Sequence, residues 1–359
     1  MKTKKTLNLL FMSVAIILIV MASGCKKDNE EQPIIPDYAW VVGNMDSTGY
    51  ALILFTPDGG DTWVRQGEGS AALQGIDLYD VWAVDTSVVW AVGMSNTVLK
   101  TTDGGVTWNR MSVPQDRHAT ELYSVSLAAP GDIWVSGSDG RVYHSKNDGV
   151  TWTIFDTSFF HNGLMQGIHA VTSDIAYVTG GVPGEASNLK GFIARTLDGG
   201  QTWDSIVPEN DYNRNEWIGV KSSDADHVVI YGGRSHYVFT TDGGQSWVND
   251  SVPNTGGTGG ADINCLTMLD ALTWWGAFDY DGIFITTNGG ASWTKQTSVG
   301  PGAMWLFGID YYDRDHAVIV AQSSVSLTGK IMKTSNGGDL WELKYLARTW
   351  LNKVSFIKK

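Results

Sequence analysis

The sequence predicts an all-β fold: a seven-bladed β-propeller of four-stranded blades whose ring is closed by the C-terminal strand completing the N-terminal blade. Three observations support this fold. An octapeptide of the form T-x-D-G-G-x-T-W occurs seven times, an apolar L-x-x-V pattern occurs seven times, and the two chain ends carry complementary parts of one blade. The 42 Gly and 16 Trp of the 359 residues also indicate short strands joined by tight turns.

The octapeptide sets the period of the repeat and forms a turn. Its closing tryptophans are 44 to 51 residues apart, which is the length of one four-stranded blade. The third-position Asp or Asn can accept hydrogen bonds from the backbone of its own turn, the fifth-position Gly can adopt positive φ, and the Trp can pack between neighbouring sheets. One carboxylate per copy offers few of the six to eight oxygens that Ca²⁺ needs, so we interpret these residues as structural. The third-position residues are Asp58, Asp103, Asn147, Asp198, Asp242, Asn288 and Asn336.

The L-x-x-V pattern precedes most octapeptides by about 18 to 25 residues and predicts the inner strand of each blade. Segments such as Val89 to Gly93 follow it, alternate at the β period and predict the second strands. The inner-strand pairs are Leu78/Val81, Leu122/Val125, Met165/Ile168, Trp217/Val220, Ile263/Leu266, Leu306/Ile309 and Leu351/Val354.

The chain ends predict how the ring closes. Tyr38 to Gly43 matches a second strand with no inner strand before it, and residues 351–356 match an inner strand with nothing after it. Pairing these segments leaves no open sheet edge. We therefore expect a single propeller domain over residues 38–357.

The N-terminal segment indicates export. Residues 1–24 combine early lysines, an apolar run from Leu7 to Met21 and small residues, and Cys25 follows directly. This arrangement resembles the lipobox of bacterial lipoproteins, although Ala22 stands where that family usually has Leu. The resemblance implies a signal peptide over residues 1–24, lipidation of Cys25, a flexible tether over residues 25–37, and attachment to a membrane, which we expect to be the outer membrane with periplasmic or surface exposure. The alternative is an uncleaved N-terminal anchor.

Charge and motif content exclude several kinds of protein. The chain has 25 basic and 38 acidic residues, so a nucleic-acid partner is not expected. The seven histidines form no metal-binding spacing, and no nucleotide or hydrolase fingerprint is present in the right context, so we expect no metal and no cofactor. Cys265 lies in an inner-strand pattern and is expected to be a buried thiol.

The octapeptide is identified as the Asp-box, or BNR repeat, which recurs in sialidases and other propellers. Together with the L-x-x-V strand and the W-A-V-G segment at residues 90–93, it resembles the photosystem II assembly and stability factors of chloroplasts and cyanobacteria. Those relatives are non-enzymatic propellers that bind membrane-protein intermediates. The resemblance implies a binding or assembly scaffold of the cell envelope whose partner is an envelope or membrane protein, without implying photosynthesis.

Two alternatives remain open: a carbohydrate-binding propeller, and a glycoside hydrolase. A sialidase-like site would resemble an arginine triad beginning in an R-I-P motif, yet residues 26–62 contain no Arg. A xyloglucanase-like cleft needs a second propeller. Fold alone does not decide between these functions.

The long second-to-third strand loops and blade-to-blade connections are expected to share one face, and binding residues concentrate on such loops. Aromatic and Arg side chains are the usual anchors of protein interfaces. The opposite interpretation, that the aromatic residues fold over the core and the charged ones are solvated, stays open. The candidate partner-binding residues are Arg117, His118, Phe159, Phe160, His161, Tyr212, Arg214, Trp217, Arg234, His236 and Tyr237.

Overall fold

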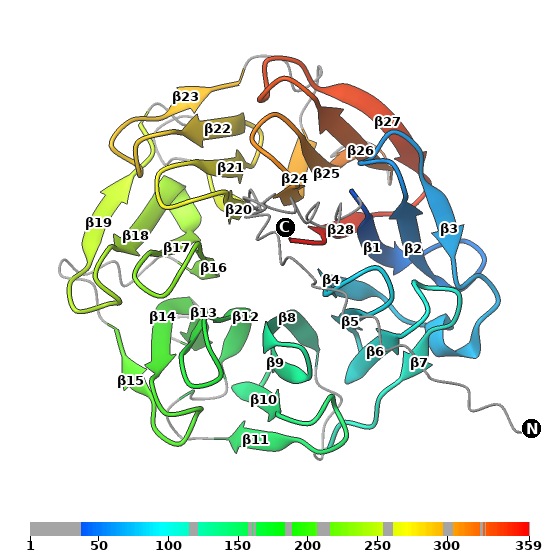
Figure 1. Ribbon diagram of the computed structural model, residues 1–359, viewed down its shortest axis with the longest axis horizontal. Coiled ribbons are helices and arrows are strands. Elements are labelled where there is room, and N and C mark those ends of the chain that lie inside the picture. The colour runs from blue at the N-terminus through cyan, green and yellow to red at the C-terminus, as the bar shows by residue number, and fades with distance from the viewer. Residues whose placement is uncertain are drawn as a thin grey trace, which may run out of the picture. The chain divides into compact units, whose positions relative to one another are not determined.

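The computed structural model describes residues 37–114, 121–156, 160, 163–183, 189–206, 216–253, 261–296, 304–323, 326 and 328–358. Their strands form seven antiparallel sheets of four strands each, which follow one another around a ring (Figure 1). The predicted seven-bladed propeller is confirmed. Among the described residues, no helix is long and apolar enough to span a membrane.

Each blade is named here from its inner to its outer strand. Blade 1 contains β28 (Leu351–Phe356), β1 (Ala39–Met45), β2 (Ala51–Thr56) and β3 (Val64–Gln66). Blade 2 contains β4 (Leu78–Ala83), β5 (Val89–Gly93), β6 (Thr97–Thr101) and β7 (Asn109–Arg110). Blade 3 contains β8 (Leu122–Ala129), β9 (Asp132–Gly137), β10 (Arg141–Ser145) and β11 (Thr153–Asp156). Blade 4 contains β12 (Leu164–Ala170), β13 (Ala176–Pro183), β14 (Leu189–Thr196) and β15 (Asp204–Ser205).

The remaining three blades follow the same order. Blade 5 contains β16 (Trp217–Ser222), β17 (Val228–Gly232), β18 (His236–Thr240) and β19 (Val248–Ser251). Blade 6 contains β20 (Ile263–Met268), β21 (Trp274–Phe278), β22 (Gly282–Thr286) and β23 (Thr294–Lys295). Blade 7 contains β24 (Met304–Tyr311), β25 (Ala317–Ser323), β26 (Gly329–Thr334) and β27 (Glu342–Ala347). Two short 3-10 helices, η1 (Ala71–Leu73) and η3 (Gly233–Ser235), lie between strands.

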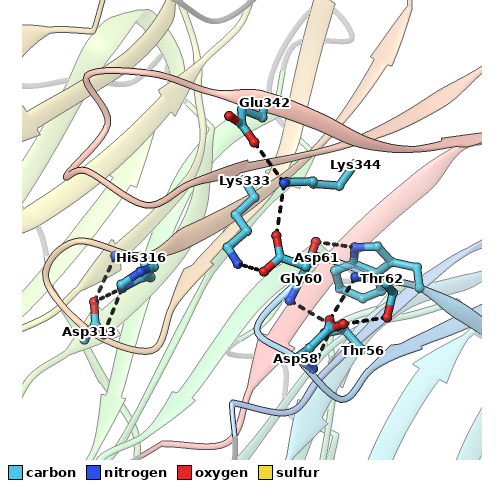
Figure 2. Close-up of polar contacts among 11 residues, drawn as sticks. Thr56, Asp58, Gly60, Asp61, Thr62, Asp313, His316, Lys333, Glu342 and Lys344 are labelled. Atoms are coloured by element: carbon cyan, nitrogen blue, oxygen red, sulfur yellow. Dashed lines mark hydrogen bonds and ion pairs between the residues drawn. The ribbon is translucent and has the colours of Figure 1, made fainter.

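The ring closes as the chain ends predict. Strand β28 pairs antiparallel with β1, with Phe356 opposite Ala39 and Val354 opposite Val41. A polar contact supports the same junction from outside, because Asp61 of blade 1 accepts a 2.7 Å hydrogen bond from Lys333 and lies 3.0 Å from the Lys344 ammonium of blade 7 (Figure 2). The first and last strands of the described chain are thereby held in one blade.

The first Asp-box shows how the repeated turn is held (Figure 2). The amide and hydroxyl of Thr62 donate to the two carboxylate oxygens of Asp58 at 2.8 and 2.6 Å. The amide of Gly60 donates to the Thr56 hydroxyl at 2.8 Å, and the Trp63 indole N–H donates to the Gly60 carbonyl at 3.1 Å. The acceptor roles of the third-position side chain and of the first-position hydroxyl recur in all seven boxes. The predicted structural turn is thus formed by local hydrogen bonds.

Two boxes depart from the consensus in informative ways. In the third box Asp148 replaces the first glycine and adopts φ of 61°, a conformation that glycine accommodates more easily, while its carboxylate pairs with Lys100 of the neighbouring blade. In the seventh box Leu340 replaces the hydroxyl residue, so only its amide donates to Asn336.

At the opposite end of the blade, a glycine near the end of the second strand lies against the backbone that precedes the inner strand. A Cβ on Gly93 would lie 2.0 Å from the carbonyl oxygen of Asp77, the residue before the inner strand, and the Met94 amide donates to that same oxygen at 2.9 Å. The equivalent separations are 1.9 to 2.3 Å at Gly43, Gly137, Gly180 and Gly232. This position therefore has no room for a side chain in five blades.

The core lies between the blades, and the box tryptophans contribute to it as predicted. Trp108 of blade 2 is buried in a cluster with Trp40 and Ile53 of blade 1, and Trp203 of blade 4 packs edge-on against Trp134 of blade 3. Inner strands also bond directly across blades: the Ser126 hydroxyl accepts from the next blade's backbone, as does that of Ser355. The predicted burial of Cys265 is confirmed at 1% exposure.

Candidate functional site

The propeller has two chemically different faces. On the face that we call the Asp-box face, the boxes of blades 2 to 7 bond to the first-to-second strand turn of their own blade; the Gly104 amide, for example, donates to the Ser87 carbonyl at 2.9 Å. In blade 1 the Gly59 amide donates to the carbonyl of Asp37, just before the second strand, at 2.9 Å. On the other, the loop face, second-to-third strand loops bond to the blade-to-blade connections, as Met94 does to Asp77. The inner strands begin at the loop face and end at the Asp-box face.

The described part of the chain contains five of the eleven sequence-predicted partner residues. Arg117, His118, Phe159, His161, Tyr212 and Arg214 lie outside the described residues. The prediction is wrong for Phe160 and Trp217, which are 0% and 3% exposed. Phe160 packs edge-on against Trp203, and Trp217 is the first apolar residue of its inner strand and belongs to the blade 5 core. Both side chains are interior, so neither can contact a partner.

The remaining candidates lie on the short connection between β17 and β18. Arg234 is exposed, adopts φ of 57°, and its amide donates to the Asp262 carboxylate at 2.8 Å. His236 is half-buried, and burial lowers the pKa of its imidazole. Tyr237 is buried and its hydroxyl donates to the Gly290 carbonyl at 3.1 Å, so it belongs to the core. Of this connection, Arg234 is the side chain presented to solvent on the loop face.

The structure reveals an aromatic cluster on the loop face that the sequence did not single out. It consists of Tyr280, Trp305 and Trp350, whose rings meet edge-to-face at centroid distances of 6.1 and 6.2 Å. Tyr280 is 59% exposed and has φ of 57°, and its amide donates to the Met304 carbonyl at 3.2 Å. The signal that could have found this cluster is positional, because both tryptophans directly precede the first apolar residue of an L-x-x-V pattern.

The same position carries carboxylates in four other blades. Asp77, Glu121, Glu216 and Asp262 precede the inner strands of blades 2, 3, 5 and 6. Nearby, burial raises the pKa of Asp279 to about 6, against a hydrogen bond from Asn264 that lowers it. The loop face therefore combines exposed aromatic surface with an acidic rim, defined as these four carboxylates.

A cavity of about 660 Å³ occupies the centre of the ring. All seven inner strands line it, and it extends to first-to-second strand turns that include Asp224, Asp313 and Arg314. It therefore lies toward the Asp-box face, which is not the face predicted to carry the site. In most blades, the residue after the last apolar position of the L-x-x-V pattern lines this cavity. These residues can be aligned with one another from the sequence alone. The distances between them across the ring cannot be obtained that way.

The carboxylates of this cavity hold the protein together. Asp80 on β4 accepts from the Ser124 hydroxyl and the Val125 amide of the next blade at 2.9 and 3.0 Å. Asp310 on β24 accepts from the Phe356 amide at 2.8 Å and pairs with Lys358. Asp224 and Asp313 cap their own turns. Each carboxylate thus already accepts structural hydrogen bonds. Among the described residues, no group of three or more His, Cys, Asp or Glu is placed to hold a metal ion.

Comparison with known proteins supports the resemblance drawn from the sequence. Residues 70–212 match the family model described as photosynthesis system II assembly factor YCF48. No curated protein sequence matches the chain. The chain is therefore a BNR-repeat β-propeller similar to this assembly factor family.

Solved structures with the same fold come from two functional classes. YCF48 from Cyanidioschyzon merolae is 18% identical, with a TM-score of 0.61, over 80% of this chain and 89% of that one. A structure described as YCF48 bound to D1 peptide is 17% identical, with a TM-score of 0.57, over 84% and 87%. The GH74 xyloglucanase from Xanthomonas campestris is 13% identical, with a TM-score of 0.57, over 89% of this chain but 56% of its own. At these identities the likeness establishes the fold.

Proposed function

We propose that this chain is a non-enzymatic scaffold of the bacterial cell envelope that binds a protein partner on its loop face. The observation that carries the proposal is the aromatic cluster beside the acidic rim, on a propeller similar to an assembly factor for which a peptide-bound structure is known. Aromatic side chains on a rigid scaffold supply large contact area at little conformational cost.

The chemistry of the loop face defines the kind of partner. Tyr280 offers an exposed ring, and Trp305 and Trp350 are half-buried, so their orientation is fixed before binding. Carboxylates at Asp262 and Glu216 lie before the inner strands of the two preceding blades. A segment that places apolar side chains on the cluster and basic ones toward the acidic rim would match both features.

Hydrolysis ranks lower because the cavity carboxylates are engaged elsewhere. Glycosidases need a carboxylic acid with a raised pKa facing a second carboxylate across the substrate. Here Asp80 and Asp310 accept backbone amides between blades. For Asp224 and Asp313, burial raises the pKa, but hydrogen bonds from their own turns, led by His227 and His316, outweigh it and lower the pKa below the ordinary value. Such groups are poor proton donors at neutral pH.

Attachment to the membrane is part of the proposal. Cys25 would carry the lipid after removal of residues 1–24, and residues 25–37 would connect it to the propeller. Metabolic labelling with an alkyne fatty acid tests this step: the wild-type chain should be labelled and recovered in membranes, whereas Cys25→Ala should be unlabelled. Labelling of both would contradict lipidation at Cys25.

The partner is tested by crosslinking the lipid-anchored chain in living Gram-negative cells and identifying what co-purifies. The Trp305→Ala/Trp350→Ala double variant should lose an envelope-protein partner that wild type retains. Leu197→Ala is the matched control, because Leu197 is an exposed apolar side chain, 51% accessible, in an Asp-box. Retention of the partner by the double variant would contradict this binding surface.

Carbohydrate binding is the second candidate, favoured by the same exposed rings, which could stack on sugars. Binding to a glycan array that is lost in the double variant, with no protein partner recovered, would replace the protein-binding proposal. A matched glycosidase assay on the same polysaccharide would decide whether binding is accompanied by cleavage.

A further inference from the structure

We propose that the central cavity is a binding site for a small organic carboxylate, held by Lys221 and Lys353 and contacting Trp82 with its apolar part. The inference concerns the Asp-box side of the molecule and does not depend on the proposed function of the loop face. The proposal rests on two lysines of the cavity that have no direct ion-pair partner within the described ranges, on the shape of the cavity and on its apolar walls.

The two lysines come from different sides of the ring. Lys221 lies on β16 and Lys353 on β28, strands that face each other across the centre (Figure 1). Both line the cavity and are half-buried. Neither makes a hydrogen bond or an ion pair with any residue of the described ranges, whereas Lys358 in the same cavity pairs with Asp310. The two ammonium groups therefore lack a direct hydrogen-bond or ion-pair partner within the described ranges, although the carboxylates of Asp80 and Asp310 act on both from a longer distance.

An enclosed ammonium without a counterion is costly, since it loses water without gaining a partner. Burial lowers the pKa of Lys221 to about 8, and the positive charge of Lys353 adds to this effect, whereas the Asp80 carboxylate opposes it. Burial also lowers the pKa of Lys353, but Tyr231 and Asp80 outweigh burial and raise that pKa above its ordinary value, so Lys353 stays charged. The chain carries a net charge of −13, yet its central cavity places two lysines that have no direct ion-pair partner within the described ranges. A bound anion would give the two ammonium groups the direct partner that they lack.

The apolar walls indicate what else the ligand carries. The Lys221 ammonium lies 5.8 Å from the centroid of the Trp82 ring, which is itself 6.0 Å from the ring of His169. Leu127 and Met268 add apolar surface. A few polar anchors among apolar walls, in a volume of about 660 Å³, is the usual composition of a small-molecule site.

The far side of the cavity argues against a chain threading through the ring. Toward the loop face, Lys221 and Lys353 also line a second space of only about 40 Å³, bounded by Gly167, Gly219 and Tyr231. A Cβ on Gly219 would lie 2.3 Å from the Tyr231 hydroxyl, so the walls are in contact there. A space of that size accommodates about one water molecule. The cavity therefore narrows at the lysines, where the charged end of a ligand would lie.

Titration of the cavity is dominated by Lys221. Burial lowers the pKa of His169 to about 3, with Lys221 and Lys358 adding to the effect, so its ring is neutral at physiological pH. Burial raises the pKa of the Cys265 thiol to about 12, so it is also neutral. The charged or titratable groups that face Lys221 from other strands are Asp80, His169, Cys265, Asp310, Lys353 and Lys358. Anion affinity should consequently fall as pH rises through about 8.

The test is isothermal titration of the full chain with benzoate and hexanoate, with benzamide as the neutral analogue and inorganic phosphate as the alternative anion. We expect both carboxylates to bind at pH 7, benzamide not to bind, and carboxylate affinity to fall about tenfold by pH 9.5. Lys221→Met and Lys353→Met should each weaken binding at least tenfold. Lys295→Met, at an exposed lysine on β23 outside the cavity, should leave it unchanged.

A second measurement separates binding from structural support. Without ligand, Lys221→Met should melt at or above the wild-type temperature, because methionine removes an unpaired buried charge while keeping the apolar stem. The proposal is overturned if neither carboxylate binds, if phosphate binds and the carboxylates do not, or if both methionine variants bind as wild type does. A marked fall in melting temperature for both ligand-free variants would instead assign the lysines a structural role.

Discussion

The Asp-box face and the loop face are built from the same seven blades, yet they differ in how uniform they are. On the Asp-box face every blade repeats the same side-chain-to-backbone bonds, with minor departures at Asp148 and Leu340. On the loop face the residue that directly precedes the L-x-x-V pattern is a carboxylate in four blades and a tryptophan in two. Positions that carry the same residue type in every blade therefore stabilise the fold, and positions whose residue type differs between blades are the candidates for ligand binding.

The central cavity extends this contrast into the inner strands. The last apolar position of the L-x-x-V pattern is always buried, whereas the residue after it differs in nearly every blade: Trp82, Ser126, His169, Lys221, Thr267, Asp310 and Ser355. Three of these, Ser126, Asp310 and Ser355, accept a backbone amide from the next blade. The lysine and the tryptophan do not, and they line the proposed carboxylate site.

Removing the strand that closes the ring should have the largest effect. A chain ending at Trp350 loses β28 and the burial of Leu351, Val354 and Phe356, each worth about 1.5–3 kcal/mol. That loss is comparable with the whole stability of a typical domain. We expect no cooperative thermal unfolding by circular dichroism, whereas a chain ending at Ile357 should still unfold cooperatively. Cooperative unfolding of the shorter chain would show that closure is dispensable.

Two adjacent glycines test whether the glycine that recurs near the end of the second strand is required for packing. In Gly232→Ala the new Cβ would lie 2.1 Å from the Glu216 carbonyl oxygen, whereas in Gly233→Ala the nearest atom is the Asp262 carboxylate at an ordinary 3.4 Å. Overpacking against backbone should lower the free energy of unfolding by about 3 kcal/mol for the first variant. The second should change it by less than about 0.5 kcal/mol. Equal denaturation midpoints in urea would contradict the packing argument.

The sequence was sufficient to predict the fold because every blade repeats the same local pattern. Gly occurs where φ is positive, Asp or Asn occurs where backbone amides need an acceptor, and apolar residues recur at the β period. It was insufficient for the site for a related reason. Trp217 fits both an exposed anchor and the first inner-strand position, and only packing decides in favour of the core. Lys221 and Lys353 are 132 positions apart in the chain, so their meeting in one cavity depends on ring closure.

Acid should weaken Asp boxes and leave Asn boxes unaffected. Hydrogen bonds from Thr107 and Ser246 lower the pKa of Asp103 and Asp242 to about 2, from an ordinary value of 3.8. Because the folded-state pKa is the lower one, their contribution is fully present above about pH 5 and is lost as pH falls through about 2. Asp103→Asn/Asp242→Asn should therefore melt below wild type at pH 7, with the difference disappearing near pH 2.

The control for this pH dependence is Asp204→Asn, at an exposed carboxylate on β15 outside the boxes. Melting curves from pH 2 to 7 should give this variant the wild-type slope. If the double box variant also keeps the wild-type slope, the boxes are not the groups that couple stability to acid.

The smallest effect should come from restoring the consensus in the seventh box. Leu340 is 51% exposed and contributes only its amide to Asn336, whereas in the box with Asn288 the Ser292 hydroxyl also accepts from the asparagine amide at 2.8 Å. Leu340→Thr should add that bond and raise the free energy of unfolding by about 0.5 kcal/mol, as measured by urea denaturation. Leu340→Val, a branched residue of similar shape without the hydroxyl, is the matched control. If both variants shift the midpoint equally, the gain reflects strand propensity, and the hydroxyl of the repeat would then be a weaker determinant of the turn than its amide.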